Sequence, residues 1–130
     1  MTTPFWCLLV VVFIPLVLAG ISGYFKSQQF GSVDNNNPRA QSAQLEGAGA
    51  RAVAAQHNAW EALAVFTASV AVAHMAGADP GWSATAAMLF VVSRILHAGF
   101  YIADIAPLRS LSFMVGTLSC IWLFTLAARA

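Results

Sequence analysis

Charged residues are scarce in this sequence, and their scarcity excludes a soluble globular domain. Only 8% of the 130 residues are charged and 59% are hydrophobic, whereas soluble domains carry about 25% charged residues. The net charge of +1 provides no dense Lys/Arg patch, which excludes binding to nucleic acid. Cysteine is also sparse: Cys7 and Cys120 both lie in apolar runs, without the Cys/His spacing of a zinc site. We therefore expect no metal and a chain that is covered largely by lipid.

Four apolar stretches are long enough to cross a membrane. A spanning helix needs about 20 predominantly apolar residues to cross about 30 Å of hydrocarbon. The stretches cover about residues 5–25, 52–77, 82–103 and 108–128. Short connections between the last three require neighbouring helices to run antiparallel. The sequence thus predicts an all-α fold, an integral membrane four-helix bundle that forms a single transmembrane domain over residues 1–130.

The longest polar stretch, residues 26–51, is predicted to be a loop on the cytoplasmic side. Basic residues flank this loop and the connection between the third and fourth helices: Lys26, Arg39, Arg51 and Arg109. By the positive-inside rule these connections are cytoplasmic, and both termini lie on the other side. Trp6, Trp82 and Trp122 then fall toward the opposite interface, where indole rings are commonly found.

Several polar side chains lie within the predicted helices at one level of the membrane. An ionisable side chain in the hydrocarbon costs a few kcal/mol, so by default it faces protein or water. The second helix carries Arg51, His57, Asn58 and Glu61; the third carries Arg94, His97 and Tyr101; the fourth begins with Arg109 and Ser110. Steps of three and four residues place such side chains on one side of a helix. We expect the three helices to form one polar layer near the cytoplasmic face.

This polar layer has more than one interpretation. Glu61 could neutralise Arg94 or Arg51 and only hold the bundle together, although small residues achieve cohesion without burying charge. His57 and His97 could face each other across a haem, and a transporter is disfavoured because the layer occupies only half of the membrane. Because cationic groups outnumber the single carboxylate, we favour an anionic ligand held by guanidinium groups. Tyr101 could then donate a hydrogen bond to a thiolate.

The residues of this layer resemble the MAPEG family, the membrane-associated proteins in eicosanoid and glutathione metabolism. Four motifs carry the resemblance, in family order: Asn37-Pro38-Arg39, the stretch from Arg51 to Glu61, the stretch from Arg94 to Tyr101, and Pro107-Leu108-Arg109-Ser110. The resemblance covers most of the chain from Asn37 onward. The chain is similar to the small bacterial members of the family, and this similarity implies that it lies in the bacterial inner membrane.

The resemblance implies a homotrimer that holds glutathione, as co-substrate, between adjacent subunits near the cytoplasmic side. It implies a glutathione-dependent transferase or peroxidase that acts on lipophilic electrophiles. The implied catalytic residues, which stabilise the thiolate, are Arg109, Ser110 and Tyr101. The implied substrate-binding residues are Arg51, His57, Asn58, Glu61, Arg94 and His97.

Three positions depart from the family pattern and favour a different function. Ala54 and His57 replace arginines of the second helix, and Phe113 replaces an aromatic hydroxyl of the fourth. The alternative is a non-catalytic protein that uses the same scaffold to bind lipid or to accompany a larger membrane complex.

Overall fold

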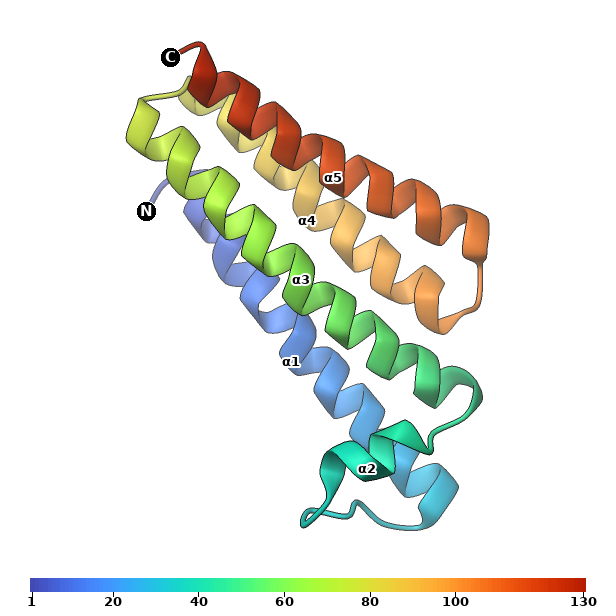
Figure 1. The fold of residues 1–130 in the computed structure, drawn as a ribbon. Helices are drawn as coiled ribbons and strands as arrows, with labels where there is room; N and C mark the ends of the chain where they lie inside the picture. The colour runs from blue at the N-terminus through green and yellow to red at the C-terminus, as the bar shows by residue number, and fades with distance from the viewer.

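All regular secondary structure of the chain is helical in the computed structural model, which describes residues 1–130. The helices are α1 (Thr3–Phe30), α2 (Pro38–Ala43), α3 (Gly47–Ala76), α4 (Pro80–Ile102) and α5 (Ala106–Ala128). Figure 1 shows the four long helices side by side, with both termini and the α3–α4 connection at one end of the bundle. The short helix α2 lies at the other end. The predicted all-α four-helix membrane bundle is confirmed.

Each long helix is able to cross a membrane. The shortest have 23 residues, which at 1.5 Å per residue gives about 34 Å, more than the hydrocarbon thickness of about 30 Å. All four are sufficiently apolar over an 18-residue window. Only 28 of the 130 residues are buried within the chain, so most apolar side chains face outward. The protein is therefore an integral membrane protein whose surface contacts lipid.

The prediction of a loop over residues 26–51 is wrong for most of these residues, because they form helix. Helix α1 continues to Phe30 and ends at Gly31, whose φ of 83° terminates it in the left-handed conformation. Lys26 explains the extension, because its buried Nζ donates to the Pro38 carbonyl at 3.0 Å. Gln29 also bonds both Gln44 and Glu46. These side-chain bonds stabilise polar helix that hydropathy alone does not detect.

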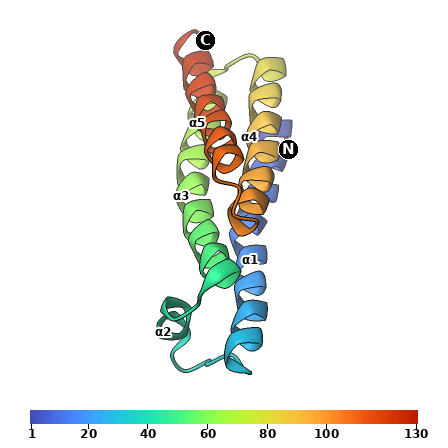
Figure 2. The same ribbon diagram turned by 90° about the vertical axis from the view of Figure 1, so that its right-hand side faces the viewer.

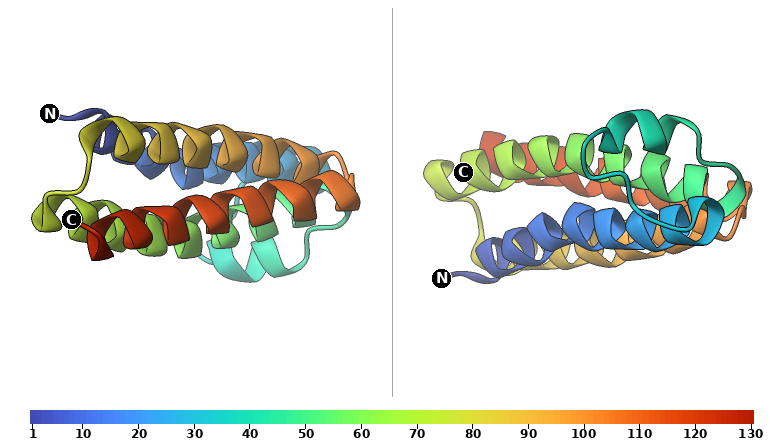
Figure 3. Two further views of the ribbon diagram at one scale, coloured as in Figure 1. Left: turned by 90° about the horizontal axis from the view of Figure 1, so that it is seen from above. Right: turned by 90° about the horizontal axis from the view of Figure 1, so that it is seen from below.

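Helix α3 begins at Gly47, several residues before the predicted start. A Cβ atom at Gly49 would lie 2.9 Å from the Cβ of Phe25, so only glycine permits this close approach of α3 to α1. Figures 2 and 3 show α2 folded to one side of the α1 and α3 ends. The segment 26–51 is thus an ordered cap on this end of the bundle.

Small residues bring the helices together, and stacked aromatic rings fill the centre. Helix α4 packs most extensively on α5, and α1 on α3. Ala52, Ala55 and Ala59 form a fully buried face of α3. In the centre, the rings of Phe66 and Phe90 stack at 4.0 Å between centroids. This core holds α3 and α4 side by side and fixes the relative heights of their polar residues.

Candidate functional site

Arg94 and His97 are buried inside the membrane-spanning part of α4. Their exposed fractions are 4% and 3%, and their spacing of three residues places them on one face. Arg94 Nη2 donates to the Oδ1 atom of Asn58 on α3 and lies 3.2 Å from His97 Nδ1. Because a guanidinium group only donates, His97 accepts at Nδ1. The Nε atom of Arg94 has no hydrogen-bond partner in the chain.

Tyr101 and Arg109 extend this polar group toward the α4–α5 connection. The ring of Tyr101 meets the ring of His97 edge-on, with centroids 5.5 Å apart. The guanidinium carbon of Arg109 lies 4.7 Å from the Tyr101 ring centroid, within the distance at which a cation is attracted to an aromatic face. A continuous row of contacts therefore joins Asn58, Arg94, His97, Tyr101 and Arg109 across three helices.

A pocket of about 260 Å³ opens beside Arg94 between α3, α4 and α5. Its polar wall consists of Asn58, Glu61 and Arg94, and its other walls are mostly apolar. The apolar and weakly polar lining residues are Ala62, Val65, Phe90, Phe113, Gly116, Thr117 and Cys120. The pocket is thus amphipathic, with a cationic group at its buried polar end.

The buried charge of Arg94 has no carboxylate partner within the chain. Glu61 lines the same pocket but is exposed and forms no ion pair with either arginine. The ion pair that the chain does contain joins Arg51 and Asp104. The interpretation that Glu61 neutralises Arg94 or Arg51 is therefore wrong within one subunit. A buried ion without a partner is costly, which makes an external anion the natural partner for Arg94.

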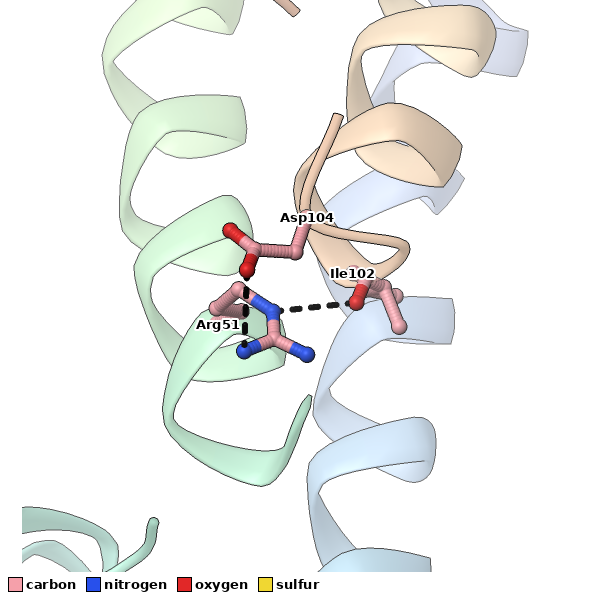
Figure 4. A network of polar contacts seen from close by, with 3 residues as sticks. All are labelled: Arg51, Ile102 and Asp104. Carbon is pink, nitrogen blue, oxygen red and sulfur yellow. Dashed lines mark hydrogen bonds and ion pairs between the residues drawn. The ribbon is translucent and has the colours of Figure 1, made fainter. Parts of the chain in front are cut away.

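Arg51 binds the connection between α4 and α5 (Figure 4). Its Nε donates to the Ile102 carbonyl at 3.0 Å, and its Nη1 lies 4.0 Å from Oδ2 of Asp104. Asp104 has a φ of 62°, a left-handed conformation that this turn requires. The role of Arg51 in substrate binding stays a prediction. Its guanidinium group is engaged at the turn that precedes Arg109.

His57 and Ser110 do not line the Arg94 pocket. His57 projects from another side of α3, where it lines a second pocket of about 490 Å³ together with Lys26, Arg39 and Gln56. Ser110 is exposed, and its side chain makes no hydrogen bond within the chain. Residues that are adjacent in sequence, His57 and Asn58, therefore face different pockets because successive helix positions point about 100° apart.

Sequence reasoning missed the small and weakly polar residues that shape the Arg94 pocket. Gly116 permits contact between α5 and α4, since a Cβ there would lie 2.9 Å from Ser93 Oγ. Buried Ser112 and Gly116 lie four residues apart on α5, and Ser119 and Cys120 follow Gly116 by three and four residues. This spacing of small residues is a recognised signal of close helix packing in membranes, and it could have identified the α5 wall.

The family model of the MAPEG family matches residues 3–129. No curated protein matches the chain.

Proposed function

Because the chain belongs to the MAPEG family, we propose that it is a glutathione-dependent transferase or peroxidase that acts on lipophilic electrophiles within the bilayer. The family supports the choice of glutathione, and the pocket beside Arg94 supports the choice of site. The single observation that carries the proposal is the buried Arg94 guanidinium, which faces a pocket and has no carboxylate partner.

The functional groups of glutathione match the polar wall of this pocket. Glutathione carries two carboxylates, an ammonium group and a thiol. The guanidinium group of Arg94 receives one carboxylate, and Asn58 offers a neighbouring amide. Glu61, which lines the same wall without an internal partner, receives the ammonium group. The matched charges give both affinity and a fixed orientation of the tripeptide.

A neighbouring subunit supplies the rest of the site in this proposal. The Arg94 pocket of about 260 Å³ is smaller than the roughly 300–1,000 Å³ typical of ligand pockets. The second pocket lies on another side of α3 and carries Lys26, Arg39 and His57 without any lining carboxylate. In a homotrimer, this cationic pocket of one subunit faces the Arg94 pocket of the next and binds the second carboxylate. This arrangement accounts for the position of His57.

Arg109 and Tyr101 stabilise the thiolate in the reaction. The Arg109 guanidinium lies over the Tyr101 ring, and together they offer a positive charge and a hydroxyl donor; Ser110, one residue further, is the alternative donor. In the transferase reaction, the thiolate sulfur forms a bond to the electrophilic carbon and the leaving group departs with its electron pair. In the peroxidase reaction, two glutathione molecules reduce an organic hydroperoxide to an alcohol and water and become a disulfide.

The same proposal includes the orientation of the protein in the membrane and the membrane in which it lies. Lys26, Arg39, Arg51 and Arg109 all lie at the α2 end of the bundle, so by the positive-inside rule this end is cytoplasmic and both termini lie outside. Glutathione reaches the site from the cytoplasm, and the electrophile arrives through the lipid. The bacterial inner membrane is the membrane that the family resemblance favours.

A thiolate titration tests the proposed chemistry. Glutathione is added to purified protein, and the ultraviolet absorbance of the thiolate is recorded at neutral pH. We expect a saturable signal in the wild type that is lost in Arg109→Ala and kept in the control Arg129→Ala, since Arg129 is exposed at the other end. A wild type without signal, or a full signal in Arg109→Ala, would contradict the proposal.

One observation favours a second candidate function, a non-catalytic lipid-binding or accessory membrane protein. Phe113 lines the Arg94 pocket and its ring lies 6.1 Å from that of His97, so this position offers a ring without a hydroxyl group. On this alternative, glutathione neither stabilises the purified protein nor gives a thiolate signal. Indifference to glutathione together with stable co-purification of another membrane complex would favour the accessory role.

A further inference from the structure

A third and larger pocket lies at the opposite end of the bundle from Arg94, where both chain termini are found. It has a volume of about 540 Å³, within the roughly 300–1,000 Å³ of pockets that bind small molecules. Residues from four segments line it: the N-terminal residues 1–4, the end of α3, the start of α4, and Leu123 on α5. The proposed chemistry at Arg94 makes no use of this pocket.

Ser83 is the feature that points to a ligand. Ser83 is 7% exposed and lines the pocket, yet its Oγ atom has no hydrogen-bond partner in the chain. The other buried serines all donate to a carbonyl three or four residues earlier in their own helices: Ser22, Ser69, Ser93, Ser112 and Ser119. Ser83 alone departs from this pattern. A buried hydroxyl without a partner costs about 1–3 kcal/mol, so a group that enters the pocket and bonds to it is favoured.

The lining of the pocket defines the chemical class of the ligand. No Asp, Glu, Lys or Arg side chain lines it, and the amino group of Met1 is the one formal charge among its lining residues at neutral pH. Val70, Ala73 and Leu123 form an apolar floor that is at least 98% buried. Thr2, Thr3 and His74 add further hydrogen-bonding groups around Ser83. This combination fits an apolar chain that ends in uncharged hydroxyl and ester groups.

The depth of the pocket in the membrane agrees with such a ligand. Trp82, next to Ser83 at the start of α4, pairs with Trp122 at 5.7 Å between ring centroids. Tryptophan gathers where the hydrocarbon meets the headgroups. The ester and hydroxyl groups of glycerolipids lie at the same level. We propose that this pocket is a binding site for a neutral amphipathic lipid of the monoacylglycerol class, with its glycerol head bonded to Ser83 and its chain on the apolar floor.

The probe for this site is a monoacylglycerol that carries a diazirine in its acyl chain. It is photolysed with the full-length protein in detergent, and the labelled peptides are identified by mass spectrometry. We expect saturable labelling on the segments around residues 70–83 and 123, and competition by unlabelled 1-monooctanoylglycerol but not by octanoate or a phosphocholine lipid. Dispersed labelling over the outer surface, or equal competition by the charged lipids, would overturn the proposal.

Substitution at Ser83 provides the second arm of the test. In Ser83→Ala we expect the affinity for the probe to fall about threefold to tenfold, the range given by loss of one neutral hydrogen bond. The matched control is Ser27→Ala, an exposed serine of α1 near the other end of the bundle, which should leave the affinity unchanged. Equal affinities in wild type and Ser83→Ala would refute the role of the hydroxyl. Because the site does not involve Arg94 or Arg109, either outcome is independent of whether glutathione binds.

Discussion

Replacing Arg94 with methionine removes the buried guanidinium and keeps an unbranched side chain of similar length. Without ligand, we expect the variant to unfold near the wild-type temperature, because a buried charge without a carboxylate partner adds little net stability. The hydrogen bond to Asn58 is lost, but Asn58 lines the pocket and is only half-buried, so its amide can be rehydrated. The substitution should therefore impair ligand binding far more than folding.

The size of the effect follows from the bond that Arg94 would make to a glutathione carboxylate. A hydrogen bond to a charged group contributes about 1.5–3 kcal/mol, so its loss weakens binding about 10-fold to 100-fold. At a glutathione concentration of about 100 times the wild-type Kd, the ligand stabilises the wild type by about 2.7 kcal/mol. At that concentration the variant gains about 1.4 kcal/mol if Kd rises tenfold, and about 0.4 kcal/mol if it rises a hundredfold.

Thermal unfolding in detergent, at one scan rate, measures the stability of the ligand-free protein. The same measurement with glutathione gives the stabilisation by the ligand. Arg129→Met is the control, because Arg129 is exposed and lies at the far end of α5. It should keep the full shift in unfolding temperature caused by glutathione. A full shift in Arg94→Met would refute the assignment of Arg94 as a ligand for glutathione. A large fall in ligand-free stability would show instead that Arg94 is a structural residue.

Three further substitutions test the catalytic, turn and packing roles. Arg109→Leu should lower kcat by about 100-fold or more with little change in KM, because it removes charge stabilisation of the thiolate; steady-state kinetics that show only a raised KM would contradict this. Arg51→Ala should lower the unfolding free energy by about 1 kcal/mol, since the Ile102 carbonyl loses a partly exposed charged donor. It should also speed amide hydrogen exchange over residues 103–105. Unchanged exchange would argue against a role of Arg51 in holding this turn. Gly116→Ala should destabilise the protein by about 1–3 kcal/mol through overpacking. Its control is Gly20→Ala, where open space surrounds the added Cβ, and this variant should be neutral or stabilising by up to about 1 kcal/mol. Similar effects at the two glycines would contradict the packing described.

The membrane-spanning helices could be predicted from the sequence because hydropathy depends only on local composition. The bilayer requires a long apolar helix at each span, so four such runs are sufficient to define the bundle. The polar ends were harder to predict. Helix α1 extends to Phe30 because Lys26 and Gln29 bond residues that are 12 or more positions away, and local hydropathy carries no information about such bonds.

Helical periodicity placed the residues of α4 correctly relative to one another, but not every residue relative to the other helices. Arg94 and His97 share a face because of their spacing, and the structure places Arg94 against both His97 and Asn58. The environment of Arg51 depends on the left-handed turn at Asp104, which brings a carbonyl and a carboxylate to its guanidinium. The pockets that His57 and Asn58 face depend on the rotation of α3, which is set by its buried alanine face, a property of packing and not of charge.

The most direct measurement is a structure of the protein in a lipid nanodisc, determined with glutathione at saturating concentration. We predict a glutathione carboxylate at about 2.7–2.9 Å from the Arg94 guanidinium, the distance of a charge-assisted hydrogen bond, with the ammonium group toward Glu61. A structure in which Arg94 instead pairs with a carboxylate of the protein, while glutathione is absent from the pocket, would contradict the proposed role of this site.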